Sequence, residues 1–291
     1  MAFGRLATAM VTPFDANLEI DFEQTKKLVN HLIKTGTDSI VVAGTTGESP
    51  TLSKNEKIKL FKKVSEFTNG RAKVIAGTGT NDTKSSIELT KKAEEAGVDG
   101  IMLVAPYYNK PSQEGLYRHF KEIAAATNLP VMIYNIPSRT GINISAKTMT
   151  ELSKIENIVA VKEASGDLTQ MAEIIKNTEE DFYLYSGDDK FTLPVMAIGG
   201  YGVVSVASHV IGKQIKAMIE SFSDGNVNEA SKLHLKMLNL FEGIFITSNP
   251  APIKDLLNQL DINVGSVRLP LIDLNEEQAD YLQEIYQKVI K

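Results

Sequence analysis

Residues 158–165 read Ile-Val-Ala-Val-Lys-Glu-Ala-Ser, an apolar run that ends in a lysine. The β-branched residues before Lys162 indicate a buried strand of a parallel sheet. A buried ammonium without a partner is costly, so such a lysine tends to lose its proton. The neutral amine can then form a Schiff base with a carbonyl substrate. A buried Lys–Asp or Lys–Glu pair that only supports the fold is the alternative for this segment.

Short apolar runs of this kind recur along the whole chain. They begin near Leu6, Ser39, Lys73, Gly100, Pro130, Ile158, Phe182 and Gly202. Amphipathic helical patterns separate them, over 22–34, 54–68, 83–96, 113–127, 145–153, 168–177 and 190–198. The alternation predicts an α/β protein with a closed (β/α)8 barrel, the TIM-barrel architecture. An open doubly wound sheet is the second choice, because it rarely needs eight near-regular units.

Further helical patterns follow the last predicted strand, over 213–222, 227–245, 251–260 and 276–289. The first of them is expected to close the barrel. The others predict a C-terminal helical extension that serves packing or assembly. We therefore expect a catalytic barrel over 1–224 and the extension over 225–291.

Composition excludes several classes of function. The chain has 291 residues and a net charge of −5, and its charges of both signs are interleaved, so no basic stripe suggests nucleic acid. No apolar run approaches the roughly 20 residues of a membrane helix, and residues 1–6 lack the pattern of a signal peptide. Cysteine is absent and the four histidines show no metal-ligand spacing. These features favour a cytoplasmic protein without a metal site.

Polar residues follow the predicted strands. In a barrel of this type the chemistry lies at the carboxyl ends of the strands. The runs found there are 44–49, 77–81, 106–111, 134–141, 162–165, 186–189 and 199–205. They predict one small polar pocket in which Tyr134, on the strand beside Lys162, can transfer protons and Arg139 can hold a carboxylate. For Tyr134 the alternative is an ordinary core tyrosine, and for Arg139 a solvated loop charge.

Three ordered motifs resemble the pyruvate-dependent class I aldolases, the family that includes dihydrodipicolinate synthase and N-acetylneuraminate lyase. They are Gly-Thr-Thr-Gly-Glu at 44–48, Tyr-Asn-Ile-Pro-Ser-Arg-Thr-Gly at 134–141 and Val-Lys-Glu-Ala at 161–164. The resemblance runs through nearly the whole chain, from residues 9–14 to residues 268–271. Within the family, segment 106–117 and Arg139 are most similar to the dihydrodipicolinate synthase branch.

The resemblance implies a lyase that condenses pyruvate with L-aspartate 4-semialdehyde to 4-hydroxy-tetrahydrodipicolinate, in lysine and diaminopimelate biosynthesis. Lys162 would form the covalent imine with pyruvate, so no metal or organic cofactor is implied. Tyr134 would be the proton donor and acceptor. Thr45, Thr46 and Tyr108 would complete its relay, with Tyr108 reaching in from a neighbouring subunit.

The resemblance also implies the substrate contacts and the assembly. Arg139 would hold the carboxylate of the semialdehyde, Thr46 and Val204 would contact pyruvate, and Gly187 would line the pocket. The family is commonly a homotetramer built from two tight dimers, although homodimers occur. Two other functions stay open. One is another aldolase of the family, a sialic acid or sugar keto-acid lyase, against which Arg139 argues. The other is a non-catalytic barrel that binds a keto acid as a sensor.

Regulation is the point at which the sequence departs from part of the family. Lysine-inhibited members bind lysine in a cleft at the dimer interface. The matching positions here are Ser49, Pro50, Lys54, Lys57, Asn81, Ser85 and Tyr107. Sensitive enzymes carry histidines at the positions of Lys54 and Lys57 and an acid at that of Ser85. Because cations replace the histidines and the acid is missing, we expect weak or absent lysine feedback.

Overall fold

The eight predicted strands form a closed parallel barrel in chain order, with the first strand beside the last. The computed structural model describes residues 3–291, so the first two residues of the predicted start lie outside the described part. The strands are β1 (Leu6–Ala9), β2 (Ser39–Val42), β3 (Lys73–Gly77), β4 (Gly100–Val104), β5 (Val131–Asn135), β6 (Ile158–Glu163), β7 (Tyr183–Ser186) and β8 (Gly202–Ser205). The predicted (β/α)8 barrel is confirmed.

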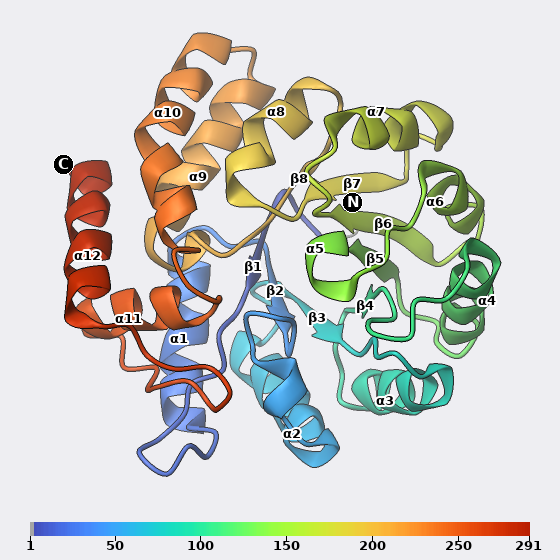
Figure 1. Cartoon of the computed structure of the whole chain (residues 1–291), viewed down its shortest axis with the longest axis horizontal. Coiled ribbons are helices and arrows are strands. Elements are labelled where there is room, and N and C mark those ends of the chain that lie inside the picture. Colours follow the sequence, from blue (N-terminus) through green and yellow to red (C-terminus); the bar gives the residue numbers. More distant parts are fainter. Residues whose placement is uncertain (1–2) are drawn as a thin grey trace.

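Helices surround the barrel and cover its outer face (Figure 1). They are α1 (Phe22–Lys34), α2 (Lys54–Thr68), α3 (Thr83–Glu95), α4 (Gln113–Ala124), α5 (Pro137–Thr140), α6 (Ala146–Leu152), α7 (Leu168–Asn177), α8 (Thr192–Ala197) and α9 (Ser208–Ser223), with the short 3-10 helices η1 (Ser49–Thr51) and η2 (Asp189–Phe191). The prediction for α9 began five residues late, at 213 instead of 208. Its first turn carries Ser208 and His209, polar residues that are fully buried, so the amphipathic pattern does not reveal it.

The C-terminal helices gather on one side of the barrel (Figure 1). They are α10 (Val227–Gly243), α11 (Ala251–Gln259) and α12 (Glu276–Ile290). Helix α10 packs against α9 and α12, and α11 also contacts α9. The extension is thus built onto the last helix of the barrel, while the division of the chain at residue 224 stays a prediction.

The apolar core has two parts, one between the barrel and its helices and one inside the barrel. The inner part includes Phe3, Met132 and Tyr185, and the Tyr185 hydroxyl donates a hydrogen bond to the Gly4 carbonyl at 2.8 Å. Tyr134 and Val204, both predicted site residues, belong to the same inner cluster. The barrel interior is therefore packed, and the polar site must lie where the strands end.

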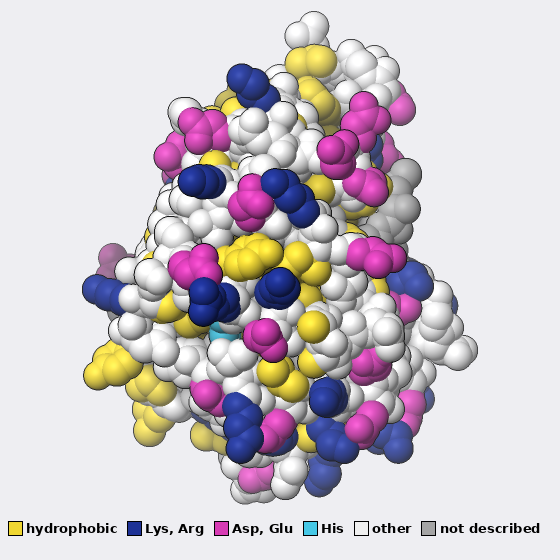
Figure 2. Space-filling view, turned by 90° about the vertical axis from the view of Figure 1, so that its right-hand side faces the viewer, with side chains coloured by type: hydrophobic (Ala, Val, Ile, Leu, Met, Phe, Trp, Pro, Cys, Tyr) yellow, Lys and Arg dark blue, Asp and Glu magenta, His cyan; other side chains and the backbone are white. Residues whose placement is uncertain are grey.

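Charges of both signs are interleaved on the face shown in Figure 2, which is the right-hand side of Figure 1. Lys and Arg side chains alternate there with Asp and Glu, as the sequence predicts. Within residues 3–291, none of the helices is both long enough and apolar enough to cross a membrane.

Candidate active site

Lys162 and Tyr134 lie side by side inside the barrel. They occupy opposite positions in the register of β5 and β6. The Lys162 side chain is buried, with 5% of its surface exposed. Its Nζ lies 4.1 Å from the centroid of the Tyr134 ring, which is a cation–π distance. The pairing predicted from the sequence is therefore present in the structure.

Burial is the main cause that lowers the pKa of Lys162, to about 8. The charge of Arg139 lowers that pKa further, whereas the carboxylates of Asp189 and Asp188 raise it. At pH 7 a group of this pKa is neutral in about a tenth of the molecules. A usable share of Lys162 is thus a nucleophilic amine near neutral pH.

Asp189 is a charged residue of the site to which the sequence alone assigned no role. Its carboxylate accepts hydrogen bonds from the Ser205 hydroxyl (2.5 Å) and from the backbone N–H groups of Val206 (2.9 Å) and Ala207 (3.2 Å). Burial raises the pKa of Asp189 to about 6, so it is mainly ionised at pH 7. It ties the end of β7 to β8 and offsets part of the cost of the Lys162 ammonium. The one available signal was its place directly after a buried strand.

The Tyr134 phenol stays protonated at neutral pH. Burial raises the pKa of Tyr134 to about 12, although a hydrogen bond with Thr45 and the charge of Arg139 oppose this shift. A protonated phenol can donate a hydrogen bond to an oxygen atom beside Lys162 and can pass a proton along a hydroxyl chain. The structure thus brings Thr45 to Tyr134, as expected.

Thr46 is held by a residue that the sequence did not reveal. The Asn249 side-chain amide donates a hydrogen bond to the Thr46 hydroxyl oxygen at 2.9 Å, and both residues are buried. Because this oxygen accepts from Asn249, the Thr46 hydroxyl keeps its own hydrogen for an acceptor in the pocket. Asn249 comes from the segment between α10 and α11, 203 residues further along the chain.

The loop that carries Thr45 and Thr46 is anchored by a buried ion pair. The Glu48 carboxylate lies 2.7 Å from the Lys254 Nζ, and the two side chains are 0% and 1% exposed. Glu48 also accepts a hydrogen bond from the backbone N–H of Arg268 at 2.9 Å. The backbone N–H of Glu48 donates to the Thr45 carbonyl at 3.1 Å. The C-terminal extension thus fixes residues 45–48 from outside the barrel.

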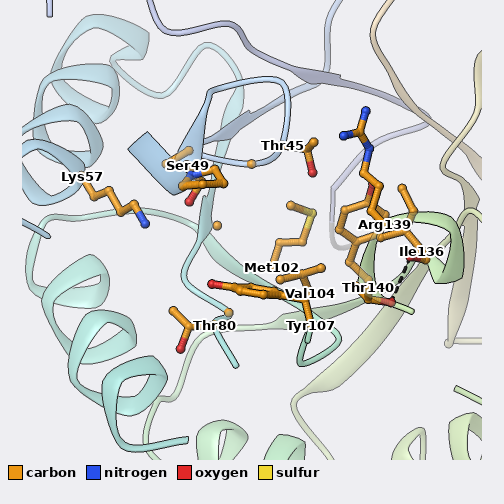
Figure 3. A pocket seen from close by; sticks show the side chains of 16 residues that line it. Thr45, Ser49, Lys57, Thr80, Met102, Val104, Tyr107, Ile136, Arg139 and Thr140 are labelled. Atoms are coloured by element: carbon orange, nitrogen blue, oxygen red, sulfur yellow. Dashed lines mark hydrogen bonds between the residues drawn. The ribbon is translucent and has the colours of Figure 1, made fainter. Parts of the chain in front are cut away.

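A cavity of about 280 Å³ opens beside Tyr134 (Figure 3). Thr45, Tyr134 and Arg139 line it, whereas Lys162, Thr46, Gly187 and Val204 are not among its lining residues. Arg139 is exposed and lies on the one-turn helix α5, not in the open turn that the sequence suggested. The helical turn forms because Pro137 starts it and the Thr140 hydroxyl donates to the Ile136 carbonyl at 3.0 Å.

Gly187 and Val204 lie where the sequence placed them, and Tyr108 does not reach the site of its own chain. A Cβ atom on Gly187 would lie 3.2 Å from the Lys162 Cε and 2.7 Å from the Ala164 Cβ, so a glycine keeps this space open. Val204 is buried on β8. Tyr108 is 89% exposed and has a positive φ of 74°. Within residues 3–291 there is no cluster of three or more His, Asp or Glu residues that could bind a metal.

A buried lysine of lowered pKa beside a protonated phenol, at the carboxyl ends of a closed barrel, defines an enzyme of the class I aldolase type. The sequence model described as the Dihydrodipicolinate synthetase family matches residues 2–289. The chain belongs to the dihydrodipicolinate synthetase family.

Relatives resemble the chain over nearly its full length. The 4-hydroxy-tetrahydrodipicolinate synthase of Heliobacterium modesticaldum is 53% identical over 287 residues, which cover 99% of this chain and 96% of the relative. The crystal structure of dihydrodipicolinate synthase from Bacillus anthracis is 56% identical, covers 98% of each chain and has a TM-score of 0.96. The enzyme of Cyanidioschyzon merolae with lysine bound is 49% identical, with a TM-score of 0.97 and coverage of 99% and 98%.

Proposed function

We infer that the chain condenses pyruvate with L-aspartate 4-semialdehyde to 4-hydroxy-tetrahydrodipicolinate, a step of lysine and diaminopimelate biosynthesis. The near-full-length identity to 4-hydroxy-tetrahydrodipicolinate synthases supports this substrate pair. The observation that carries the inference is the Lys162–Tyr134 pair at the end of the barrel. A lyase for sialic acid or a sugar keto acid is the other aldolase function, and no relative reported above favours it.

The first step is the attack of the neutral Lys162 amine on the keto carbon of pyruvate, with loss of water to give an imine. The imine withdraws electrons, so the methyl group of pyruvate loses a proton and an enamine forms. No metal or organic cofactor is required for this step, because the iminium group is the electron sink. Gly187 leaves room for the adduct beside the lysine, and Val204 is the apolar contact of pyruvate.

Tyr134 is the group that moves protons while the imine forms and breaks down. Thr45 is hydrogen-bonded to Tyr134, and Thr46 can donate its own hydrogen because Asn249 occupies its oxygen. These contacts support a relay through the three hydroxyls. We assign the outer member of the relay to Tyr108 of a neighbouring subunit, because Tyr108 is exposed on its own chain.

The carbon–carbon bond forms when the enamine attacks the aldehyde carbon of the semialdehyde. The amino group of the semialdehyde then adds to the imine carbon, closes the ring and releases Lys162. Arg139 holds the carboxylate of the semialdehyde at the mouth of the cavity, where its exposed guanidinium can bind both oxygens.

Borohydride trapping tests this function directly. The full chain is incubated with pyruvate and borohydride, and the reduced adduct is mapped by peptide mass. We expect an adduct on Lys162 and on no other lysine, together with turnover when the semialdehyde is supplied. An adduct without turnover of the semialdehyde would leave the Schiff base intact and exclude the proposed aldehyde. The absence of an adduct on folded protein would exclude the class I mechanism.

Arg139→Ala is expected to raise the KM for the semialdehyde by about ten- to a hundredfold, the effect of one lost charge-assisted hydrogen bond. Imine formation with pyruvate should persist. Its rising pH limb should move to higher pH, because the Arg139 charge helps to lower the pKa of Lys162. Steady-state kinetics and pH-dependent trapping measure both effects. Arg118→Ala is the matched control, since Arg118 is an exposed arginine that pairs only with Glu114. Normal semialdehyde kinetics in Arg139→Ala would refute the assigned role.

Weak or absent lysine feedback also stays a prediction. Lys54 forms an exposed ion pair with Glu88 at 2.7 Å, and Lys57 lines the cavity. A lysine ammonium entering this region meets cations. A titration with lysine should leave the rate unchanged through the millimolar range, and strong inhibition below one millimolar would contradict the charge argument. Assembly as a tetramer or dimer and a cytoplasmic location are proposals of the same standing; light scattering after size exclusion decides the assembly.

A further inference from the structure

The cavity beside Tyr134 extends away from the catalytic residues. We call this part the Lys57 limb; its lining residues are Ser49, Pro50, Lys57, Thr80 and Tyr107. Figure 3 shows Lys57 and Arg139 on opposite sides of the space, with the ring of Tyr107 between them. The Lys57 side chain points from α2 into the limb, towards Ser49 (Figure 3).

The lining of the cavity contains two cations and no carboxylate. The acidic residues that lie near it in sequence are engaged elsewhere. Glu48 pairs with Lys254, Glu88 pairs with Lys54, and Asp82 caps the start of α3. Lys57 forms no ion pair and no hydrogen bond within residues 3–291, although it is half-buried and burial lowers the pKa of Lys57.

Hydroxyl donors surround this ammonium. Within the described residues, the side chains of Ser49 and Tyr107 make no hydrogen bond. In Figure 3 the Tyr107 hydroxyl points towards the side of the cavity where Lys57 lies. The Thr80 hydroxyl differs, because it is already bonded to the Asp82 carbonyl at 2.9 Å and to Ser86 at 3.0 Å. A desolvated cation with free hydroxyl donors favours an anion as its partner.

We propose that the Lys57 limb is a second binding site, for a small organic carboxylate, separate from the Lys162 centre. Lys57 supplies the charge, and Ser49 and Tyr107 supply hydrogen bonds to the carboxylate oxygens. The volume of the cavity admits a ligand of a few carbon atoms. Binding at this limb does not depend on the proposed reaction.

The limb is linked to the catalytic loop through the backbone. The N–H of Ser49 donates to the Gly44 carbonyl at 3.2 Å, and Thr45 on the same loop bonds to Tyr134. An occupied limb therefore acts on kcat more than on the KM of pyruvate, since Ser49 touches the loop and not Lys162.

Calorimetric titration of the full chain with succinate tests the site. We expect saturable binding that becomes about ten- to a hundredfold weaker in Lys57→Gln, through loss of one charge-assisted bond. Lys54→Gln is the matched control, because Lys54 lies on the same helix but pairs with Glu88 at the surface. Its affinity should equal that of the wild type. Tyr107→Phe should weaken binding severalfold and serves as the second variant if Lys57→Gln does not fold.

The Arg139→Ala variant separates the limb from the catalytic mouth. Unchanged succinate affinity in Arg139→Ala, together with the loss in Lys57→Gln, supports the second site. Loss of binding in Arg139→Ala with normal binding in Lys57→Gln would place the carboxylate at the catalytic mouth and overturn the proposal. The absence of saturable succinate binding to the wild type would overturn it as well.

Discussion

Lys162→Ala should lower kcat/KM by about four orders of magnitude or more, because removal of a covalent nucleophile leaves only binding and orientation effects. The fold should remain, since the Lys162 ammonium is buried and its burial opposes the charged form. Coupled turnover and borohydride trapping measure the loss, and circular dichroism with thermal unfolding reports on the fold.

Lys162→Arg separates nucleophilicity from charge. Arginine keeps a cation beside Tyr134 and Asp189, but its guanidinium stays protonated and cannot form the imine. We expect this variant to be as inactive as Lys162→Ala and equally free of trapped pyruvate. Turnover within tenfold of the wild type in either variant would contradict the assignment of Lys162.

Lys254→Met should destabilise the protein by about 3–5 kcal/mol, the usual effect of breaking one partner out of a buried ion pair. The substitution keeps the length of the side chain and leaves the Glu48 carboxylate buried with only the backbone N–H of Arg268 as a donor. The Lys254 Nζ also loses its contact with the Phe14 ring and its bond to the Ser266 carbonyl. Urea unfolding at fixed protein concentration measures the change.

The double variant Glu48→Gln with Lys254→Met is the control for this effect. It removes both charges, so a large part of the lost stability should return if the unpaired carboxylate is the cause. Lys288→Met is a matched single control, because Lys288 forms an exposed ion pair with Glu284 on α12. Its effect should stay within about 1 kcal/mol. Equal losses in the exposed and the buried variants would refute the structural role of the Glu48–Lys254 pair.

The fold follows from local sequence patterns to a large extent. Each apolar run precedes an amphipathic segment, and parallel strands buried on both faces need only such runs, so all eight strands are predicted near their true starts. The Ser53–Glu56 capping box fixes the start of α2 in the same way. The first turn of α9 was missed because Ser208 and His209 are buried for polar reasons: the Ser208 hydroxyl bonds to Thr8, and His209 accepts from the Val11 backbone.

The central site was predictable because consecutive strands of a parallel barrel are neighbours. Lys162 and Tyr134 end adjacent strands, so their contact follows from the fold once the strands are aligned. The supports of the site could not be found this way. Asn249 and Lys254 belong to no motif, and Arg268 meets Glu48 across 220 residues of chain. Such contacts depend on how the extension docks, which no local pattern encodes.

The anchoring of residues 45–48 by the extension also has a consequence for the order in which the protein is made. All eight strands, Lys162 and Tyr134 leave the ribosome before Asn249, Lys254 and Arg268 have been translated. A nascent chain can therefore build the barrel while Thr46 and Glu48 still lack their partners. Catalytic competence arrives with the last fifth of the polypeptide, and a ribosome stalled before residue 249 would display a barrel without a finished active site.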